Sequence, residues 1–301
     1  MKNLSTLILV LGLALVGYAG WLYVGETSAA PDAAQAAAVN AAQNTAETPA
    51  PDSAPTLATA PPAPYPPALY ITRERRDLEA EASDGSDYTP EVRDVTTLRI
   101  RNGLRLRRVG LYDGGQGEVA RPVIILFHGA ARDELSMIDM WDDVADANGL
   151  LLVSLKSADT RWDLGTDERP LIAAALTQAE ATIPIDRDRM FLFGHSNGSI
   201  YAQFLAHRAD GPWRAVATHA GTLPAEGMRL RDDGPPIRHY LGAYDHIFPM
   251  EEARAAALTL SEHGHRSELM VIPLHNHWFY NAGPRIARDA WAWFEVMAPA
   301  Q

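Results

Sequence analysis

The 301-residue sequence contains no cysteine. This absence excludes disulfide bonds, thiolate metal ligands, a cysteine nucleophile and membrane attachment through a lipidated N-terminal cysteine. The chemistry of the chain must therefore rest on serine, histidine, aspartate, glutamate or backbone groups.

Positive charge is scarce as well. The chain has 26 lysine and arginine residues against 38 aspartate and glutamate residues, which gives a formal net charge of −12. A protein that binds nucleic acid needs a positive face to displace the counterions around the phosphates. The charge balance therefore argues against nucleic acid as a partner.

A long apolar run stands near the N-terminus, where Leu4–Val24 follows the basic residue Lys2. Its length suits one crossing of a bilayer. The apolar part of a signal peptide is shorter, roughly 7–15 residues, but the small residues of "TSAAP" and "AQAAA" offer cleavage sites. We expect residues 1–25 to be an uncleaved signal-anchor, with a cleaved signal peptide as the alternative. Either interpretation predicts export: anchored in the inner membrane facing the periplasm or the outside, or secreted.

Large apolar residues are almost missing from residues 26–67, which are rich in alanine, proline and threonine. Such a segment has too little to bury, so we expect a disordered tether. The remaining residues, 68–301, form the predicted catalytic domain.

Short apolar runs alternate with helical patterns in this domain. Val95–Gly115 predicts two strands around Asn102-Gly103, a strong hairpin signal. After it, strand-like runs such as "RPVIILF" and "RMFLFGHS" are separated by helical segments, including one over "DELSMIDMWDDVADANG". Unbroken apolar runs between helices are typical of parallel strands buried on both faces. The predicted fold is therefore α/β, with a mostly parallel central sheet, helices on both faces and a preceding hairpin.

A candidate nucleophile lies where one predicted strand meets the next helix. The stretch Gly194-His195-Ser196-Asn197-Gly198 has the Gly-x-Ser-x-Gly pattern of a nucleophile elbow, in which flanking glycines allow a sharp turn that exposes the serine oxygen. An ordinary glycine-rich turn is the alternative.

A serine nucleophile needs a base, and the base needs an orienting acid. In this architecture the partners follow in the order serine, acid, histidine. Asp245 stands just after a later strand, with helix capping as its alternative role. His275 and His277 both follow the last strand. We favour His277 because the aromatic residues that follow it could fix its ring, and His275 is the alternative base. Metal binding by the two histidines is a further alternative, although no carboxylate is close in sequence.

Two backbone N–H groups should stabilise an oxyanion. Asn197 follows the nucleophile, and Ala130, with Ala131 as second choice, follows the "LFHG" strand end. Trp162 and His195 are candidates for the substrate pocket, with plain packing as the alternative for each. We expect no metal and no cofactor.

The motifs "LFHGA", "FGHSNGSIYA", "LGAYDHIFP" and "HNHW" resemble the α/β-hydrolase superfamily, closest to secreted serine esterases of the poly(3-hydroxybutyrate) depolymerase and feruloyl esterase type. The resemblance spans about residues 95–298. It implies Ser196 as nucleophile, Asp245 as acid and His277 as base. The chain departs from that branch in lacking cysteine and in having "PLHNHW" where a glycine-rich run often precedes the base.

The sequence thus predicts an exported or membrane-tethered serine hydrolase that cleaves small or polymeric carboxylic esters. A serine peptidase of the prolyl-oligopeptidase type shares this catalytic core, but no propeller or long N-terminal domain is present. A non-catalytic cell-envelope binding relative is the other alternative, although such proteins usually lose a triad residue. The sequence does not predict the oligomeric state.

Overall fold

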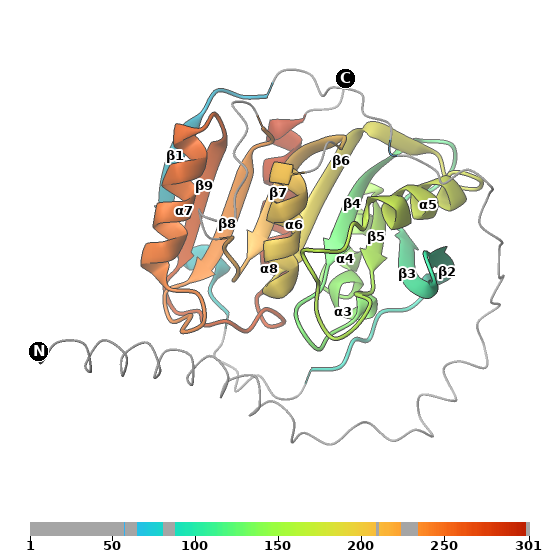
Figure 1. The fold of residues 1–301 in the computed structure, drawn as a ribbon, viewed down its shortest axis with the longest axis horizontal. Helices are drawn as coiled ribbons and strands as arrows, with labels where there is room; N and C mark the ends of the chain where they lie inside the picture. Colours follow the sequence, from blue (N-terminus) through green and yellow to red (C-terminus); the bar gives the residue numbers. More distant parts are fainter. Residues whose placement is uncertain (1–56, 58–64, 81–87, 209–210, 224–233, 299–301) are drawn as a thin grey trace, which may run out of the picture. The chain divides into compact units, whose positions relative to one another are not determined.

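The structure is a computed structural model that describes residue 57 and residues 65–80, 88–208, 211–223 and 234–298 (Figure 1). The predicted apolar span Leu4–Val24 and most of the predicted tether lie outside these residues. None of the described helices is long and apolar enough to cross a membrane.

Nine strands form one sheet at the centre of the fold. They are β1 (Leu69–Glu74), β2 (Thr96–Asn102), β3 (Arg105–Asp113), β4 (Arg121–Phe127), β5 (Leu151–Leu155), β6 (Ile185–His195), β7 (Trp213–His219), β8 (Ile237–Gly242) and β9 (Arg266–Ile272). Their order across the sheet is β1-β9-β8-β7-β6-β4-β5-β3-β2. All neighbours pair in parallel except β5 with β3 and β3 with β2. The sheet is therefore mostly parallel, as predicted.

The two antiparallel strands at one edge form a hairpin. Asn102 pairs with Arg105, so the turn residues are Gly103 and Leu104, one position later than the sequence pattern suggests. Gly103 has a φ of 62°, a left-handed conformation that glycine adopts without steric cost.

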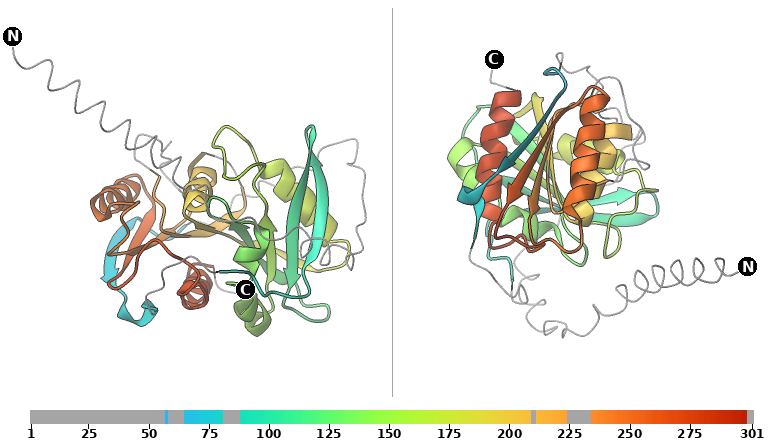
Figure 2. Two further views of the ribbon diagram at one scale, coloured as in Figure 1. Left: turned by 90° about the horizontal axis from the view of Figure 1, so that it is seen from below. Right: turned by 90° about the vertical axis from the view of Figure 1, so that its left-hand side faces the viewer.

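Helices cover both faces of the sheet (Figures 1 and 2). The apolar side chains of α5 (Arg169–Ala179), α6 (Asn197–Arg208) and α7 (Met250–Glu262) pack on one face. Those of α3 (Glu134–Ile138), α4 (Asp142–Asn148) and α8 (Gly283–Met297) pack on the other. Strand β4 contributes side chains to the packing on both faces. Val123 and Ile125 pack on the first face, and Ile124 and Leu126 pack on the second. This two-sided burial explains its unbroken apolar sequence.

The single helix predicted between β4 and β5 is wrong: the structure has two short helices, α3 and α4. The interruption follows Asp139, whose carboxylate accepts hydrogen bonds from the Tyr88 hydroxyl and the Glu91 N–H. Trp141, the last residue of the break, is fully buried and packs against Phe193. These contacts come from residues distant in sequence, so the local pattern gave no sign of them.

Strand β1 and a three-residue 3₁₀ helix, η1 (Arg76–Leu78), precede the hairpin, and the sequence pattern did not predict either. Two described residues of the predicted tether also contact the folded part. Leu57 is buried against the face that carries α5 and α6, and the Tyr65 hydroxyl donates to the Trp213 carbonyl at 3.1 Å. These two contacts place the end of the predicted tether against the sheet.

Candidate active site

Ser196 lies at the turn between β6 and α6, where the carboxyl ends of the parallel strands meet. Its φ is 53°, a left-handed conformation that costs a non-glycine residue about 1–3 kcal/mol. Such strain persists only where the surroundings enforce it. The turn therefore has the backbone geometry of a nucleophile elbow.

Both glycines of the motif are required by close backbone approach. A Cβ atom at Gly194 would lie 2.3 Å from the Gly198 carbonyl oxygen, inside the turn itself. A Cβ atom at Gly198 would lie 2.2 Å from the Phe127 carbonyl oxygen at the end of β4. The glycines therefore let helix α6 start directly against the neighbouring strand.

Three side chains from three loops meet at this turn. The Ser196 Oγ lies 2.9 Å from His277 Nε2, and His277 Nδ1 lies 2.9 Å from Asp245 Oδ2. Asp245 follows β8, and His277 lies between β9 and α8. The carboxylate accepts the Nδ1 proton, which leaves Nε2 free to accept the serine proton. The arrangement is that of a nucleophile, a base and an orienting acid.

Asp245 is held ionised by several donors. Its side chain is fully buried, and Oδ1 accepts hydrogen bonds from the N–H groups of Ile247 at 2.8 Å and Phe248 at 3.0 Å. Burial alone would raise the pKa of Asp245, but the hydrogen bond from His277 and the two backbone donors hold it below its ordinary value. The carboxylate is therefore charged at neutral pH, although it also caps the turn before α7.

The structure brings His277, and not His275, to Ser196. The ring that stacks on His277 belongs to Phe248, at 5.7 Å between centroids, so it comes from the acid loop. The sequence argument relied instead on the aromatic residues after His277, and that reason is wrong. Of these, Phe279 stacks on His195 at 5.0 Å. His275 is buried and its Nε2 lies 2.8 Å from His219 Nε2.

The loop after β4 runs beside the nucleophile. A Cβ atom at Gly129 would lie 3.4 Å from the Ser196 Cβ, so the next peptide N–H, that of Ala130, is close to the turn. The Ala131 N–H is already bonded to the Thr160 carbonyl at 2.7 Å. No acceptor in the described part of the chain takes a hydrogen bond from the N–H of Ala130 or Asn197. These two donors are thus available to an oxyanion.

His128, whose own role the sequence analysis did not predict, fixes this loop. Its Nδ1 lies 2.7 Å from the Gly129 carbonyl, and its Nε2 accepts the Ser157 N–H at 3.0 Å. The two contacts define one neutral tautomer, with the proton on Nδ1. Burial lowers the pKa of His128 to about 3, so the ring stays neutral. The only sequence signal was its position at the end of an apolar strand.

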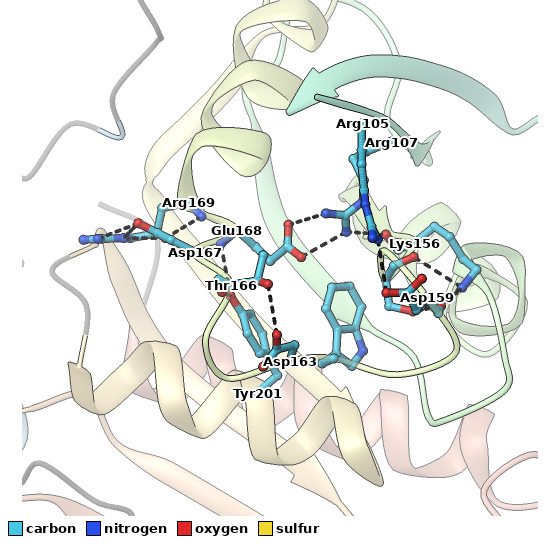
Figure 3. A network of polar contacts seen from close by, with 12 residues as sticks. Arg105, Arg107, Lys156, Asp159, Asp163, Thr166, Asp167, Glu168, Arg169 and Tyr201 are labelled. Atoms are coloured by element: carbon cyan, nitrogen blue, oxygen red, sulfur yellow. Dashed lines mark hydrogen bonds and ion pairs between the residues drawn. The ribbon is translucent and has the colours of Figure 1, made fainter. Parts of the chain in front are cut away.

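A buried ion pair anchors the loop between β5 and α5 (Figure 3). The Arg107 guanidinium binds both oxygens of Glu168 at 3.0 Å and donates to the Lys156 carbonyl at 2.7 Å. At the other end, the Tyr201 hydroxyl on α6 donates to the Thr166 carbonyl at 2.7 Å and accepts the Glu168 N–H. Helix α6 and strand β3 therefore hold this loop from two sides.

Trp162, on the same loop, is hydrogen-bonded to Asn197 and to His128. Its backbone N–H donates to the Asn197 Oδ1 and its indole N–H donates to the His128 carbonyl at 2.8 Å. The ring is only 3% exposed and packs against Phe127 and Tyr201. This burial favours packing over a role in the substrate pocket.

A cavity of about 370 Å³ borders the loop after β4. It is lined by residues that include Arg108, Ala131, Arg132, Lys156, Asp159 and Thr160. Its walls carry charges of both signs. The part of the chain that the structure describes contains no group of three or more histidine or carboxylate side chains placed to hold a metal.

No family model matches the chain. A protein of Nocardia uniformis subsp. tsuyamanensis named "Putative esterase NocK" is 27% identical to it over 205 residues, which are 64% of this chain and 59% of that protein. The match therefore spans about three fifths of the relative's length.

Several solved structures are similar in fold. Esterase 2 of Thermogutta terrifontis, phosphorylated by paraoxon, has a TM-score of 0.58 and 14% identity, over 72% of this chain and 100% of that chain. The α/β hydrolase MGS-M1 from a Medee basin deep-sea metagenome has a TM-score of 0.55 and 15% identity, over 69% and 98%. The sugar hydrolase YeeB of Lactococcus lactis has a TM-score of 0.54 and 14% identity, over 68% and 97%. At these identities the likeness concerns the fold, and the chain has the α/β-hydrolase fold.

Proposed function

We propose that the chain hydrolyses carboxylic esters through an acyl-enzyme on Ser196. The observation that carries the proposal is the continuous hydrogen-bonded path from Ser196 through His277 to Asp245, built on a strained elbow. The name of the Nocardia relative supports ester hydrolysis as the reaction class. No observation favours the peptidase or the non-catalytic alternative.

In the first half of the reaction, the Ser196 oxygen attacks the ester carbonyl while His277 Nε2 takes the serine proton. The buried Asp245 carboxylate, 2.9 Å from Nδ1, stabilises the imidazolium that forms. The N–H groups of Asn197 and Ala130 bind the developing oxyanion. The tetrahedral intermediate then collapses, the alkoxide takes the proton from His277, and the alcohol leaves.

In the second half, a water molecule replaces the alcohol. His277 removes a proton from the water as its oxygen attacks the acyl carbon, and the same two N–H groups bind the second oxyanion. Collapse breaks the bond to Ser196, whose oxygen regains the proton from His277. The carboxylic acid is released and the enzyme returns to its starting state.

The resemblance to poly(3-hydroxybutyrate) depolymerase and feruloyl esterase type proteins supports a polymeric or aromatic ester as the substrate. A panel of p-nitrophenyl esters of increasing length, feruloyl esters and poly(3-hydroxybutyrate) would rank these classes. An aminoacyl anilide belongs in the panel, because preferential cleavage of the anilide would replace the esterase assignment with a peptidase one.

The nucleophile can be tested with a fluorophosphonate probe, which labels activated serines. We expect the wild type to be labelled and Ser196→Ala to be neither labelled nor active. Ser199→Ala is a matched control, since Ser199 lies three residues further along, in α6. Its hydroxyl lies 2.7 Å from the carbonyl oxygens of both Gly194 and His219 and donates to one of them at a time. Labelling that survives Ser196→Ala would place the nucleophile elsewhere.

We also propose that residues 1–25 export the chain and that residues 26–67 link this segment to the catalytic domain, 68–301. The support is the apolar sequence Leu4–Val24 behind Lys2. A reporter enzyme fused to the C-terminus should be active only outside the cytoplasm. Recovery of the full-length chain in the soluble cytoplasm would contradict this proposal.

A further inference from the structure

Three buried histidines form a hydrogen-bonded row behind the nucleophile. His195 ends β6, His219 ends β7, and His275 lies in the loop after β9. His195 Nδ1 lies 3.0 Å from His219 Nδ1, and His219 Nε2 lies 2.8 Å from His275 Nε2. The three residues are at most 5% exposed.

All three rings are neutral at neutral pH. Burial lowers the pKa of His195 and of His219 well below the ordinary value, and neighbouring imidazoles lower both further. Burial also lowers the pKa of His275, to about 4. A neutral imidazole has one N–H donor and one bare nitrogen acceptor. Each contact in the row can therefore be an N–H···N hydrogen bond.

The number of protons restricts the row to two states. Three neutral rings carry three N–H groups, and the two hydrogen bonds between rings use two of them. The third must sit at one end, on His195 Nε2 or on His275 Nδ1. Moving it from one end to the other reverses both inner hydrogen bonds and changes the tautomer of all three rings.

The His195 end of the row faces the loop after β4. A Cβ atom at Gly129 would lie 3.3 Å from His195 Nε2, and the next N–H is that of Ala130. Stacking on Phe279 and an edge contact with Tyr280 fix the ring plane. No group in the described part of the chain hydrogen-bonds to His195 Nε2, and this nitrogen is not fully buried. It therefore keeps some exposure beside the loop after β4.

We propose that His195 is a further substrate-positioning residue, whose Nε2–H donates a hydrogen bond to the bound ester beside the oxyanion N–H groups, and that His219 and His275 set its tautomer. An ester offers oxygen acceptors and no donor, so its binding selects the state with the proton on His195 Nε2. His275 Nδ1 then becomes an acceptor. This inference rests on the proposed ester hydrolysis at Ser196.

The most direct test uses ¹⁵N NMR of the histidine rings, whose shifts distinguish protonated from bare nitrogens. In wild-type enzyme carrying the fluorophosphonate adduct, whose phosphoryl oxygen is an acceptor, His195 Nε2 should be protonated and Nδ1 bare. Couplings across both N–H···N contacts should be visible before and after labelling. A bare Nε2 in the adduct, or absence of the couplings, would overturn the proposal.

A remote substitution tests the row as a unit. Glutamate at position 275 accepts hydrogen bonds when ionised, so His275→Glu should force His219 to donate outward and leave His195 Nε2 bare. His275→Gln has the same size and can donate or accept, so it should keep the wild-type tautomer. We expect kcat/KM per titrated active site to fall roughly 3- to 10-fold in His275→Glu and less than about twofold in His275→Gln, the range for one hydrogen bond between neutral groups.

Structural damage has a different signature. It would reduce the number of titrated sites and leave kcat/KM per site unchanged, as we expect for the control His239→Gln, which alters a buried histidine of β8 outside the row. If the carboxylate introduced by His275→Glu acted only through its electrostatic effect on His277, the His195 tautomer would stay as in wild type. The same His195 tautomer in His275→Glu and His275→Gln would refute the inference. If the wild type hydrolyses no ester but shows both couplings across the N–H···N contacts, the proposed function would be refuted and the hydrogen-bonded row of histidines would be retained.

Discussion

Replacing Asp245 with asparagine should separate the two tasks of this side chain. Oδ1 accepts two backbone N–H groups, from Ile247 and Phe248, whereas Oδ2 accepts only the His277 Nδ1 proton. At about 1 kcal/mol per hydrogen bond, the asparagine carbonyl should stay with the two backbone donors. Its amide N–H group then faces His277 Nδ1.

An amide donor at that place requires His277 Nδ1 to be bare. The ring proton then moves to Nε2, which can no longer accept the proton of Ser196. We expect kcat to fall by roughly 10⁴-fold near neutral pH, the size of effect found when a triad acid is replaced by its amide. The melting temperature should change little, because both backbone hydrogen bonds remain.

Steady-state kinetics and a thermal melt of Asp245→Asn check both expectations. Asp245→Ala is the companion variant, because it also removes the backbone acceptor and should lower the free energy of unfolding by about 1–3 kcal/mol. Near-normal turnover in Asp245→Asn would refute the triad assignment. Two aspartates of the loop between β5 and α5 have other partners: Asp159 pairs with Arg105, and Asp163 accepts from the N–H of Gly165.

Three other changes have defined outcomes. Gly198→Ala should abolish activity and lower the melting temperature, because the new Cβ would lie 2.2 Å from the Phe127 carbonyl oxygen; retention of activity would refute the packing argument. Glu168→Gln should lower the free energy of unfolding by about 3–5 kcal/mol in urea titrations, because it leaves the buried Arg107 charge unpaired; an unchanged midpoint would contradict this. Acid should destabilise the fold, since buried histidines with lowered pKa bind protons only when unfolded. Stability should be complete above the unfolded pKa of about 6.5 and fall as pH drops below it, by up to about 1.4 kcal/mol per pH unit for each such histidine. Those with values of about 3 to 4 are His128, His239 and His275. Urea midpoints that stay constant from pH 7 to about pH 5 would contradict this prediction.

The sheet could be predicted from the sequence because its central strands are buried on both faces. Strand β4 is fully buried along its length, so each of its side chains must be apolar or have a polar partner. The resulting apolar run can be recognised from the sequence alone. Strand β1 was not predicted because it is not buried in this way. It lies at the sheet edge, most of its residues are exposed or half-buried, and only its pairing with β9 defines it.

The proposed catalytic residues could be predicted because each lies within a few residues of the end of a recognisable strand. The networks of contacts that surround these residues could not be predicted. The row behind His195 joins residues 24 and 56 positions apart, and the Arg107–Glu168 pair joins residues 61 positions apart. A side chain that acts through a distant partner leaves no local pattern, and both networks depend on how the strands are ordered in the sheet.

The left-handed backbone of Ser196 is shared by only three other non-glycine residues in the described part of the chain: Asp94, Ala131 and Ala220. Ala131 lies on the loop after β4 and Ala220 follows His219, so three of the four strained positions are near the candidate active site. Glycine at each would relieve about 1–3 kcal/mol of strain, partly offset by the greater freedom it gives the unfolded chain. Laboratory evolution that screens only for heat resistance would thus tend to enrich glycine at these positions. A clone with glycine at position 196 would gain heat resistance and lose the proposed nucleophile.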